Sequence, residues 1–152
     1  MNIEQTFDYQ VRSTLFSMMR MYNLLAQEHG ITQGVGYSLM MIPKEGIPAT
    51  KIAPAMGMGS SSLSRLLKGL ENNKLIIKKI SETDKRVTNI YLTEKGNKLR
   101  KTIKAKVIHF NQEILKQVSQ EELEVYRHVS EAIRNQAQLE VDLKQQEKKN
   151  KI

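Results

Sequence analysis

The residues best suited to bind a polyanion lie in one short stretch, residues 60–68. Four leucines in and after it recur at i, i+3, i+4 and i+7, the period of one helical face: Leu63, Leu66, Leu67 and Leu70. The other side of this helix carries hydroxyls and cations: Ser61, Arg65 and Lys68, with Ser62 and Ser64 at its flanks and Ser60 in the first turn. Small hydroxyls and cations let a helix approach a polyanion and donate hydrogen bonds to phosphates and base edges. The stretch therefore predicts a helix, over about residues 60–73, whose polar face suits a nucleic acid.

A basic hairpin is expected directly after this helix. Two strands are predicted at residues 75–80 and 86–92, with a polar tip between them. The cations of the hairpin and its tip are Lys78, Lys79, Lys85 and Arg86. Antiparallel pairing of the strands places Ile90 and Leu92 against the helices. The hairpin then presents its charge to the same partner as the helix.

A short helix and a tight corner are expected before the serine-rich helix. Pro48 suits the first turn of that short helix, where a missing N–H costs nothing. Pro54 removes a hydrogen bond inside a helix and clashes with the preceding turn, at about 3 kcal/mol, so the helix should be short, kinked or ended near it. Gly57 and Gly59 flank Met58 and supply the backbone freedom that a corner needs. Gly59 takes the N-cap position of the next helix.

Two helices are predicted in the N-terminal part of the chain. Apolar residues recur on a helical period over residues 5–28, and Gly30 stands where a C-terminal glycine usually ends a helix. A second helix is expected at about residues 33–43, followed by a turn at Glu45 and Gly46.

Two long helices are predicted in the C-terminal part. Thr93 is a good N-cap for a fifth helix, in which apolar residues recur at steps of three and four over residues 99–118. Ser119 caps a sixth helix and forms a capping box with Glu122. From Lys144 onward the sequence is polar and basic, and we expect this end to fray.

Two joined segments carry a family resemblance. From Leu75 to Gly96 the sequence LIIKKISETDKRVTNIYLTEKG resembles the wing of the MarR family of bacterial transcriptional regulators, with its basic strand, its D-x-R tip and L-T-E-K-G opening a long helix. Upstream, IAPAMGMGSSSLSRLLKGLENNKLI is similar to that family's helix-turn-helix, with Gly57 at the corner and Ser64-Arg65 in the recognition helix. The segments join without a gap and the flanking helices fit the family's plan, so the resemblance covers nearly the whole chain.

The resemblance implies a fold that is mainly α with a small β-hairpin wing (α+β), a winged helix-turn-helix with N- and C-terminal dimerisation helices. Residues 1–152 are expected to form a single MarR-like domain. Its parts would be dimerisation helices at 1–30 and 100–145, a winged helix-turn-helix DNA-binding region at 33–98 and a polar tail at 146–152. The apolar stripes of the first, fifth and sixth helices exceed what a small winged domain can cover, which favours a homodimer. The alternative is an intramolecular helical hairpin in a monomer.

The expected partner of this arrangement is double-stranded DNA. Recognition helices of a dimer enter successive major grooves, so the operator should be a pseudo-palindrome with half-sites about 10 bp apart. Arg86 is the best candidate to enter a flanking minor groove. Asp84 is expected to orient Arg86, because a carboxylate near phosphate is repelled. Three lysines should add sequence-independent affinity for phosphate: Lys78, Lys79 and Lys85.

Structural roles for the same residues stay open. Arg65 is the candidate for a base-edge or phosphate contact, yet it could form a salt bridge with Glu71 or Asp84. Residues 60–62 could be the polar first turn of any helix. Arg86 could pair with Asp84, although such a pair does not exclude contact with DNA.

The charge distribution supports a polyanion partner. The chain has 24 Lys and Arg against 16 Asp and Glu, a net charge of +8. Residues 44–100 hold twelve of the cations and five of the anions, whereas the other 95 residues are nearly balanced. A basic segment of this kind is the electrostatic footprint of a nucleic-acid partner, and a solvated charged face is the alternative.

Composition excludes several other classes. The chain has no cysteine, which removes disulfides, thiolate metal ligands and cysteine-based peroxide sensing. The N-terminus lacks the charged and apolar regions of a signal peptide, and no apolar run approaches the length of a membrane span, so a cytoplasmic protein without membrane association is expected. Aromatic residues are 5% and none is Trp, which argues against a single-strand-binding surface built on base stacking.

An effector site is the least defined expectation. Many regulators of the resembled family hold a small ligand between the dimerisation helices and the winged region. The candidate lining is Met18, Met19, Tyr22, Tyr37, Met40, Met41 and Phe110, which suits a small apolar or aromatic ligand. Methionines at helical spacing are more often plain core. The three histidines have no metal-ligand spacing on one helix, and we expect neither a metal nor a cofactor.

Two function classes compete with the regulator. The resemblance implies a sequence-specific transcriptional regulator, a homodimeric repressor relieved by a small-molecule effector. A winged-helix protein-interaction module, such as an antirepressor or scaffold, is the alternative, and Pro54 with the glycine-rich corner favours it slightly. An enzyme has little support, because no catalytic triad, phosphate loop or acidic metal cluster is recognisable.

Overall fold

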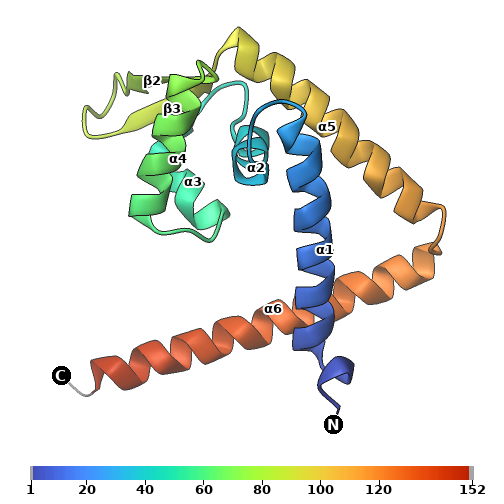
Figure 1. Ribbon diagram of the computed structural model, residues 1–152. Coiled ribbons are helices and arrows are strands. Elements are labelled where there is room, and N and C mark those ends of the chain that lie inside the picture. The colour runs from blue at the N-terminus through green and yellow to red at the C-terminus, as the bar shows by residue number, and fades with distance from the viewer. Residues whose placement is uncertain (1, 151–152) are drawn as a thin grey trace. The chain divides into compact units, whose positions relative to one another are not determined.

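The computed structural model describes residues 2–150, with Ser60 described by its backbone alone. The chain forms two compact units: a larger unit of residues 12–108, and a smaller unit made of the described parts of residues 1–11 and 109–152. The described residues form six α-helices and a small sheet, whose course along the chain can be followed by colour in Figure 1. No helix within the described residues combines the length and the apolar character that crossing a membrane requires.

The larger unit holds the helix-turn-helix and the sheet. Its elements are α1 (Phe7–Gln27, from residue 12 onward), α2 (Gln33–Met41), β1 (Ile47–Pro48), α3 (Ala49–Ala55), α4 (Ser60–Asn72), β2 (Ile76–Ile80), β3 (Thr88–Leu92) and α5 (Glu94–Leu115, up to residue 108). The predicted boundaries of α1, α2 and α4 agree with the observed ones to within two residues at each end, whereas α5 ends three residues before residue 118, the end of the predicted apolar period. The fold class expected from the sequence is confirmed.

The sheet has one strand more than the sequence predicted. Its order is β1-β3-β2 and both pairings are antiparallel, whereas the expected wing was a hairpin of two strands. In β1, Ile47 pairs with Ile90 and Pro48 with Asn89. A strand of two residues that includes a proline has no alternating pattern, so only its tertiary partner reveals it. Figure 1 shows the β2–β3 hairpin beside α4.

The core of the larger unit lies between its helices and the inner face of this sheet. Its buried apolar side chains are Leu39, Ile42, Ile52, Leu63, Leu67, Leu70, Leu75, Ile76 and Ile90. Three of the four leucines of the predicted α4 stripe are among them, and Leu66 packs against them partly buried. Ile90 is fully buried and Leu92 is partly buried, as the hairpin register predicted. Burial of this stripe turns the opposite side of α4 outward.

Residues with special backbone requirements shape the connections between these helices. Gly30 has a φ of +66°, and Ile31 N–H donates to the Ala26 carbonyl at 3.2 Å, a Schellman motif that ends α1. Gly46 has a φ of +84°, and a Cβ there would collide with the ring of Tyr91. The turn predicted at this glycine is therefore required both by its conformation and by its contact with β3.

The corner between α3 and α4 agrees with the sequence in most respects. The α3 helix has only 7 residues and ends one residue after Pro54, as expected for a helix that contains an internal proline. Gly57 has a φ of +62°, but Gly59 does not use the left-handed region, since its φ is −77°. Gly59 is the N-cap of α4 and provides no side-chain hydrogen bond. Pro48 is the N-cap residue of α3 rather than part of its first turn.

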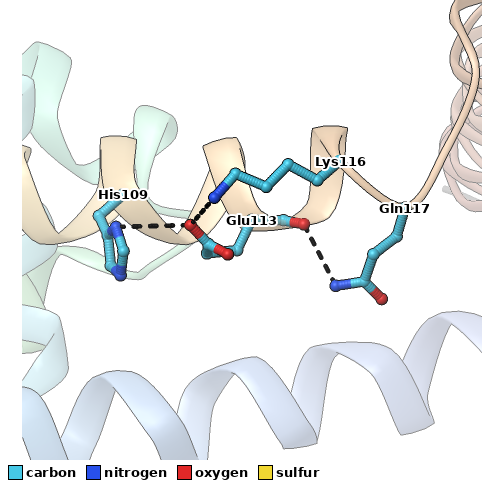
Figure 2. Close-up of polar contacts among 4 residues, drawn as sticks. All are labelled: His109, Glu113, Lys116 and Gln117. Carbon is cyan, nitrogen blue, oxygen red and sulfur yellow. Dashed lines mark hydrogen bonds and ion pairs between the residues drawn. The ribbon is translucent and has the colours of Figure 1, made fainter.

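The smaller unit contains a short 3-10 helix η1 (Ile3–Gln5), the first turn of α1, the end of α5, and α6 (Gln120–Lys149). The predicted capping box is present, because the Ser119 hydroxyl accepts from Glu122 N–H at 3.1 Å and Glu122 accepts from Ser119 N–H at 2.7 Å. Figure 2 shows the end of α5, where Glu113 lies 2.6 Å from Lys116 and 3.9 Å from His109.

The C-terminal end of α6 differs from the expectation. The prediction of fraying from Lys144 onward is wrong for residues 144–149, because α6 continues to Lys149. Lys, Gln and Glu have high helix propensity, and Lys144 pairs with Glu147 at 2.9 Å across one turn. The part of the predicted tail at residues 151–152 lies outside the described residues.

Candidate nucleic-acid interface

The polar side of α4 faces solvent. Its exposed residues are Ser61, Ser62, Ser64, Arg65 and Lys68. The sequence forms a helix here because its leucines share one stripe and no β-branched residue or proline interrupts them. The apolar stripe binds α4 to the core, which turns the polar face and its two cations toward solvent. The side chain of Ser60 is not among those described.

The salt bridges proposed as a structural role for Arg65 are not observed. Glu71, one of the two predicted partners, pairs instead with Lys78, whose Nζ lies 2.7 Å from Glu71 Oε2. Asp84, the other predicted partner, accepts a hydrogen bond from the main chain of the wing tip. Among the described residues no hydrogen bond or ion pair engages the guanidinium of Arg65, so this charge remains available on the exposed face of α4.

The wing tip is organised by its own polar groups. Asp84 Oδ1 accepts a hydrogen bond from the main-chain N–H of Arg86 at 2.9 Å. The Ser81 hydroxyl accepts from Asp84 N–H at 3.3 Å, and Ser81 N–H donates to the Val87 carbonyl at 2.8 Å. Asp84 thus holds the backbone of Arg86 and leaves its guanidinium exposed. Such Asx contacts stabilise tight turns in which the following side chain points outward.

The three wing lysines lie in different environments. Lys85 is exposed at the tip, whereas Lys78 is engaged with Glu71 on α4. Lys79 Nζ lies 5.5 Å from the centre of the Tyr91 ring, a cation–π contact across the hairpin. Sequence reasoning identified neither Glu71 nor Tyr91 as a partner of these lysines. The strand register could have indicated Tyr91, because it pairs with Ile77, two residues before Lys79.

The residues expected to line an effector site are distributed over three helices. Met18, Met19 and Tyr22 are on α1, and Tyr37, Met40 and Met41 are on α2, all within the larger unit, while Phe110 on α5 belongs to the smaller unit. Met18, Met19 and Tyr37 are exposed. Burial raises the pKa of the Tyr22 phenol. Within residues 2–150, no group of three His, Cys, Asp or Glu side chains is arranged to hold a metal.

A short helix, a glycine corner, a helix with an exposed polar face and a basic hairpin together define a winged helix-turn-helix of the MarR type, the fold of DNA-binding transcriptional regulators. The chain belongs to the family of transcriptional regulators described as SarA/Rot, which matches residues 20–103, or 84 of its 152 residues.

Solved structures of regulators show the same architecture. The chain is similar to MepR of Staphylococcus aureus in complex with DNA, with 26% identity, a TM-score of 0.79, and coverage of 87% of this chain and 98% of MepR. A second MepR structure, described as a transcription regulator of the multidrug efflux pump MepA, has 25% identity, a TM-score of 0.64 and the same coverage. The regulator SlyA shares the fold, with 23% identity, a TM-score of 0.76, and coverage of 84% of this chain and 91% of SlyA.

Proposed function

We propose that this regulator binds a pseudo-palindromic DNA operator as a homodimer and represses transcription there. The recognition helix is α4, and Arg65 with the neighbouring serines reads the major groove. Arg86 enters the flanking minor groove, while Lys85 contributes affinity for phosphate without regard to sequence. The proposal is supported by the match to the SarA/Rot family and by the similarity to the MepR–DNA complex.

The observation that carries the proposal is the availability of two guanidinium groups on neighbouring elements. Arg65 on α4 and Arg86 at the wing tip are both exposed, and no described side chain pairs with either. In a folded protein, nearby carboxylates commonly pair with such cations. Here Glu71 and Asp84 are engaged elsewhere, so both guanidiniums are free for a negatively charged partner.

The exposed apolar side chains of the long helices support a dimer. On α1 these include Phe7, Phe16 and Leu24, and on α6 they include Tyr126 and Leu139. No residue of α6 is buried by the single chain. Exposed apolar faces of this extent favour association with an identical surface, because association removes them from water.

We further propose that a small apolar or aromatic compound relieves repression. The exposed side chains of Met18, Met19 and Tyr37 are adaptable apolar contacts for such a ligand. A planar aromatic compound should raise the Tm of the wild-type protein and release it from its operator. The Met19→Ala variant should need a higher concentration of the compound for both effects. Equal responses of variant and wild type would remove this residue from the proposed ligand site.

The test of DNA recognition begins with selection of bound sites from a random-duplex library. We expect a pseudo-palindrome with half-sites about 10 bp apart. The Arg86→Glu variant should bind the selected duplex at least about tenfold more weakly than wild type. Lys101→Glu is the matched control, since it makes the same change of charge at an exposed site on α5. Placing the selected duplex over a promoter then tests whether the protein lowers the transcript yield.

Two salt concentrations separate specific from unspecific binding. A protein that binds only phosphates loses affinity steeply with salt and selects no sequence. Sequence-blind binding that responds equally to Arg86→Glu and Lys101→Glu would contradict the proposal and favour a protein-interaction module.

A further inference from the structure

Three consecutive carbonyls directly after α4 each accept a hydrogen bond from Thr93 or Lys95, at the start of α5. Lys95 Nζ donates to the Asn73 carbonyl at 3.0 Å, and the Thr93 hydroxyl donates to the Lys74 carbonyl at 2.7 Å. The main-chain N–H of Thr93 donates to the Leu75 carbonyl at 3.1 Å. These carbonyls lie in the turn between α4 and β2, so donors from the start of α5 fix the backbone of that turn. We call these three hydrogen bonds the α4–α5 bracket.

The bracket surrounds a residue in an unfavourable conformation. Lys74 has a φ of +57°, in the left-handed region where glycine is favoured. Lys74 N–H donates to the Glu71 carbonyl at 2.8 Å and Leu75 N–H to the Leu70 carbonyl at 2.9 Å, which is the Schellman pattern of a helix end. A lysine at this position holds the turn only with support from its surroundings, and the Thr93 hydroxyl provides that support at the Lys74 carbonyl.

Close packing at the same place leaves α5 little freedom to move. A Cβ on Gly96 would collide with the carbonyl oxygen of Leu75. Gly96 is buried, and its N–H donates to the Thr93 hydroxyl at 3.0 Å. The first turn of α5 therefore lies directly against the backbone that follows α4, within the larger unit.

We propose that Thr93 is a positioning residue for DNA recognition, acting through the α4–α5 bracket. Its hydroxyl fixes the backbone at Lys74 and so sets the direction of α4 relative to the wing and to α5. This inference rests on the proposed function, since it concerns the accuracy with which α4 reads an operator. A shift of α4 weakens hydrogen bonds to base edges more than it weakens contacts with phosphates, because base contacts require closer geometry.

The Thr93 hydroxyl also performs a second task that must be separated from the first. As the N-cap of α5 it accepts from Gly96 N–H, whereas in the bracket it donates to the Lys74 carbonyl. Thr93→Ser keeps both functions. Thr93→Asp keeps the acceptor for the cap but has no donor for the bracket, and Thr93→Val has neither.

The experiment measures two quantities for each variant: the Tm, and the ratio of affinities for the selected operator and a scrambled duplex of equal length. We expect Thr93→Ser to match wild type in both. Thr93→Asp keeps the helix cap, so its Tm should fall less than that of Thr93→Val, but its affinity ratio should fall about tenfold because α4 is no longer held in place. Thr93→Val should have both a lower Tm and a lower affinity ratio than wild type.

The controls are at Thr102, which lies on the same helix. Its hydroxyl donates to the Lys98 carbonyl of its own helix at 3.3 Å. Thr102→Asp adds the same charge as Thr93→Asp and should leave the affinity ratio unchanged. If Thr93→Asp and Thr102→Asp have the same ratio, the Thr93 hydroxyl is a helix cap and the inference is wrong.

Hydrogen exchange without DNA keeps this test independent of the proposed function. The amides of Lys74 and Leu75 should exchange faster in Thr93→Asp and Thr93→Val than in wild type or Thr93→Ser. If exchange at both amides is unchanged, Thr93 does not hold the backbone at Lys74, and the inference is wrong even if operator binding is specific. If the wild-type protein selects no operator but these amides respond, the bracket exists and the proposed function has failed.

Discussion

The two helices α4 and α6 are both amphipathic, but they are stabilised differently. In α4, with 13 residues, Leu63, Leu67 and Leu70 are buried in the core of the larger unit. In α6, with 30 residues, no residue is buried, and Tyr126 is 66% exposed. Both have an apolar stripe of helical period. The comparison teaches that periodicity predicts which face will be buried but not which surface will bury it.

The physical difference lies in the surroundings of the two stripes. Around α4, the helices α2 and α3 and the sheet supply apolar side chains such as Leu39, Ile52 and Ile90 from the same chain. No described residue of α6 belongs to the buried core, so we expect association to stabilise its stripe. The order of α6 should therefore depend strongly on protein concentration, whereas the stability of the larger unit, which has its own buried core, should depend on it less.

The largest expected effect is at the centre of the larger unit. Ile90→Ala should lower the free energy of unfolding by about 2–5 kcal/mol, because Ile90 is fully buried and the truncation leaves a cavity. Ile80→Ala is the control, since Ile80 lies on the adjacent strand and is 66% exposed. Urea denaturation at two protein concentrations measures both. An equal decrease in the free energy of unfolding for the two variants would contradict the assignment of Ile90 to the core.

The second largest effect is expected in the dissociation constant of the dimer. Tyr126→Ala should weaken the dimer by about tenfold or more, since aromatic side chains dominate such interfaces. Sedimentation equilibrium measures the dissociation constant, and His128→Ala, another exposed site on α6, is the control. A monomeric wild-type protein, or equal dissociation constants for both variants, would remove the proposed role of α6.

The smallest effect is expected at the start of α6. Hydrogen bonds from Ser119 lower the pKa of Glu122 below its ordinary value of 4.5. A lowered pKa means that this contribution to stability is present above pH 4.5 and is lost as the pH falls through the lower folded-state pKa. Glu122→Gln keeps an acceptor for Ser119 N–H but loses the charge, so it should lower the Tm by about 2 °C at neutral pH, and the difference from wild type should shrink in acid. A difference that is independent of pH would contradict this.

Most of the fold could be predicted because its signals are local. The leucine period of α4, the alternation around Ile90 and the capping box at Ser119 each depend on residues close in sequence. The third strand could not be predicted, since Ile47 and Pro48 form a strand only through their pairing with β3. The end of α6 was wrongly expected to fray because its polarity outweighed its helix propensity in the prediction.

The candidate interface was predictable in its residues but not in their pairing. The sequence placed Arg65 and Arg86 on suitable elements but left open salt bridges that would occupy them. The structure places Glu71 against Lys78, and Asp84 against the main chain of Arg86. The first pairing joins residues on two different elements, and the second depends on the conformation of one turn. Residue type alone predicts neither pairing.

By itself, the sequence determined the helices, the basic hairpin and the polar face of α4, because hydrophobic period, capping residues and charge act over short distances. Only the tertiary structure decided which cations pair with other residues and where the start of α5 meets the turn after α4. The left-handed Lys74, the Thr93 hydroxyl and the buried Gly96 meet across about twenty residues of chain. Their contact depends on the wing closing back on itself, and no local pattern encodes that closure.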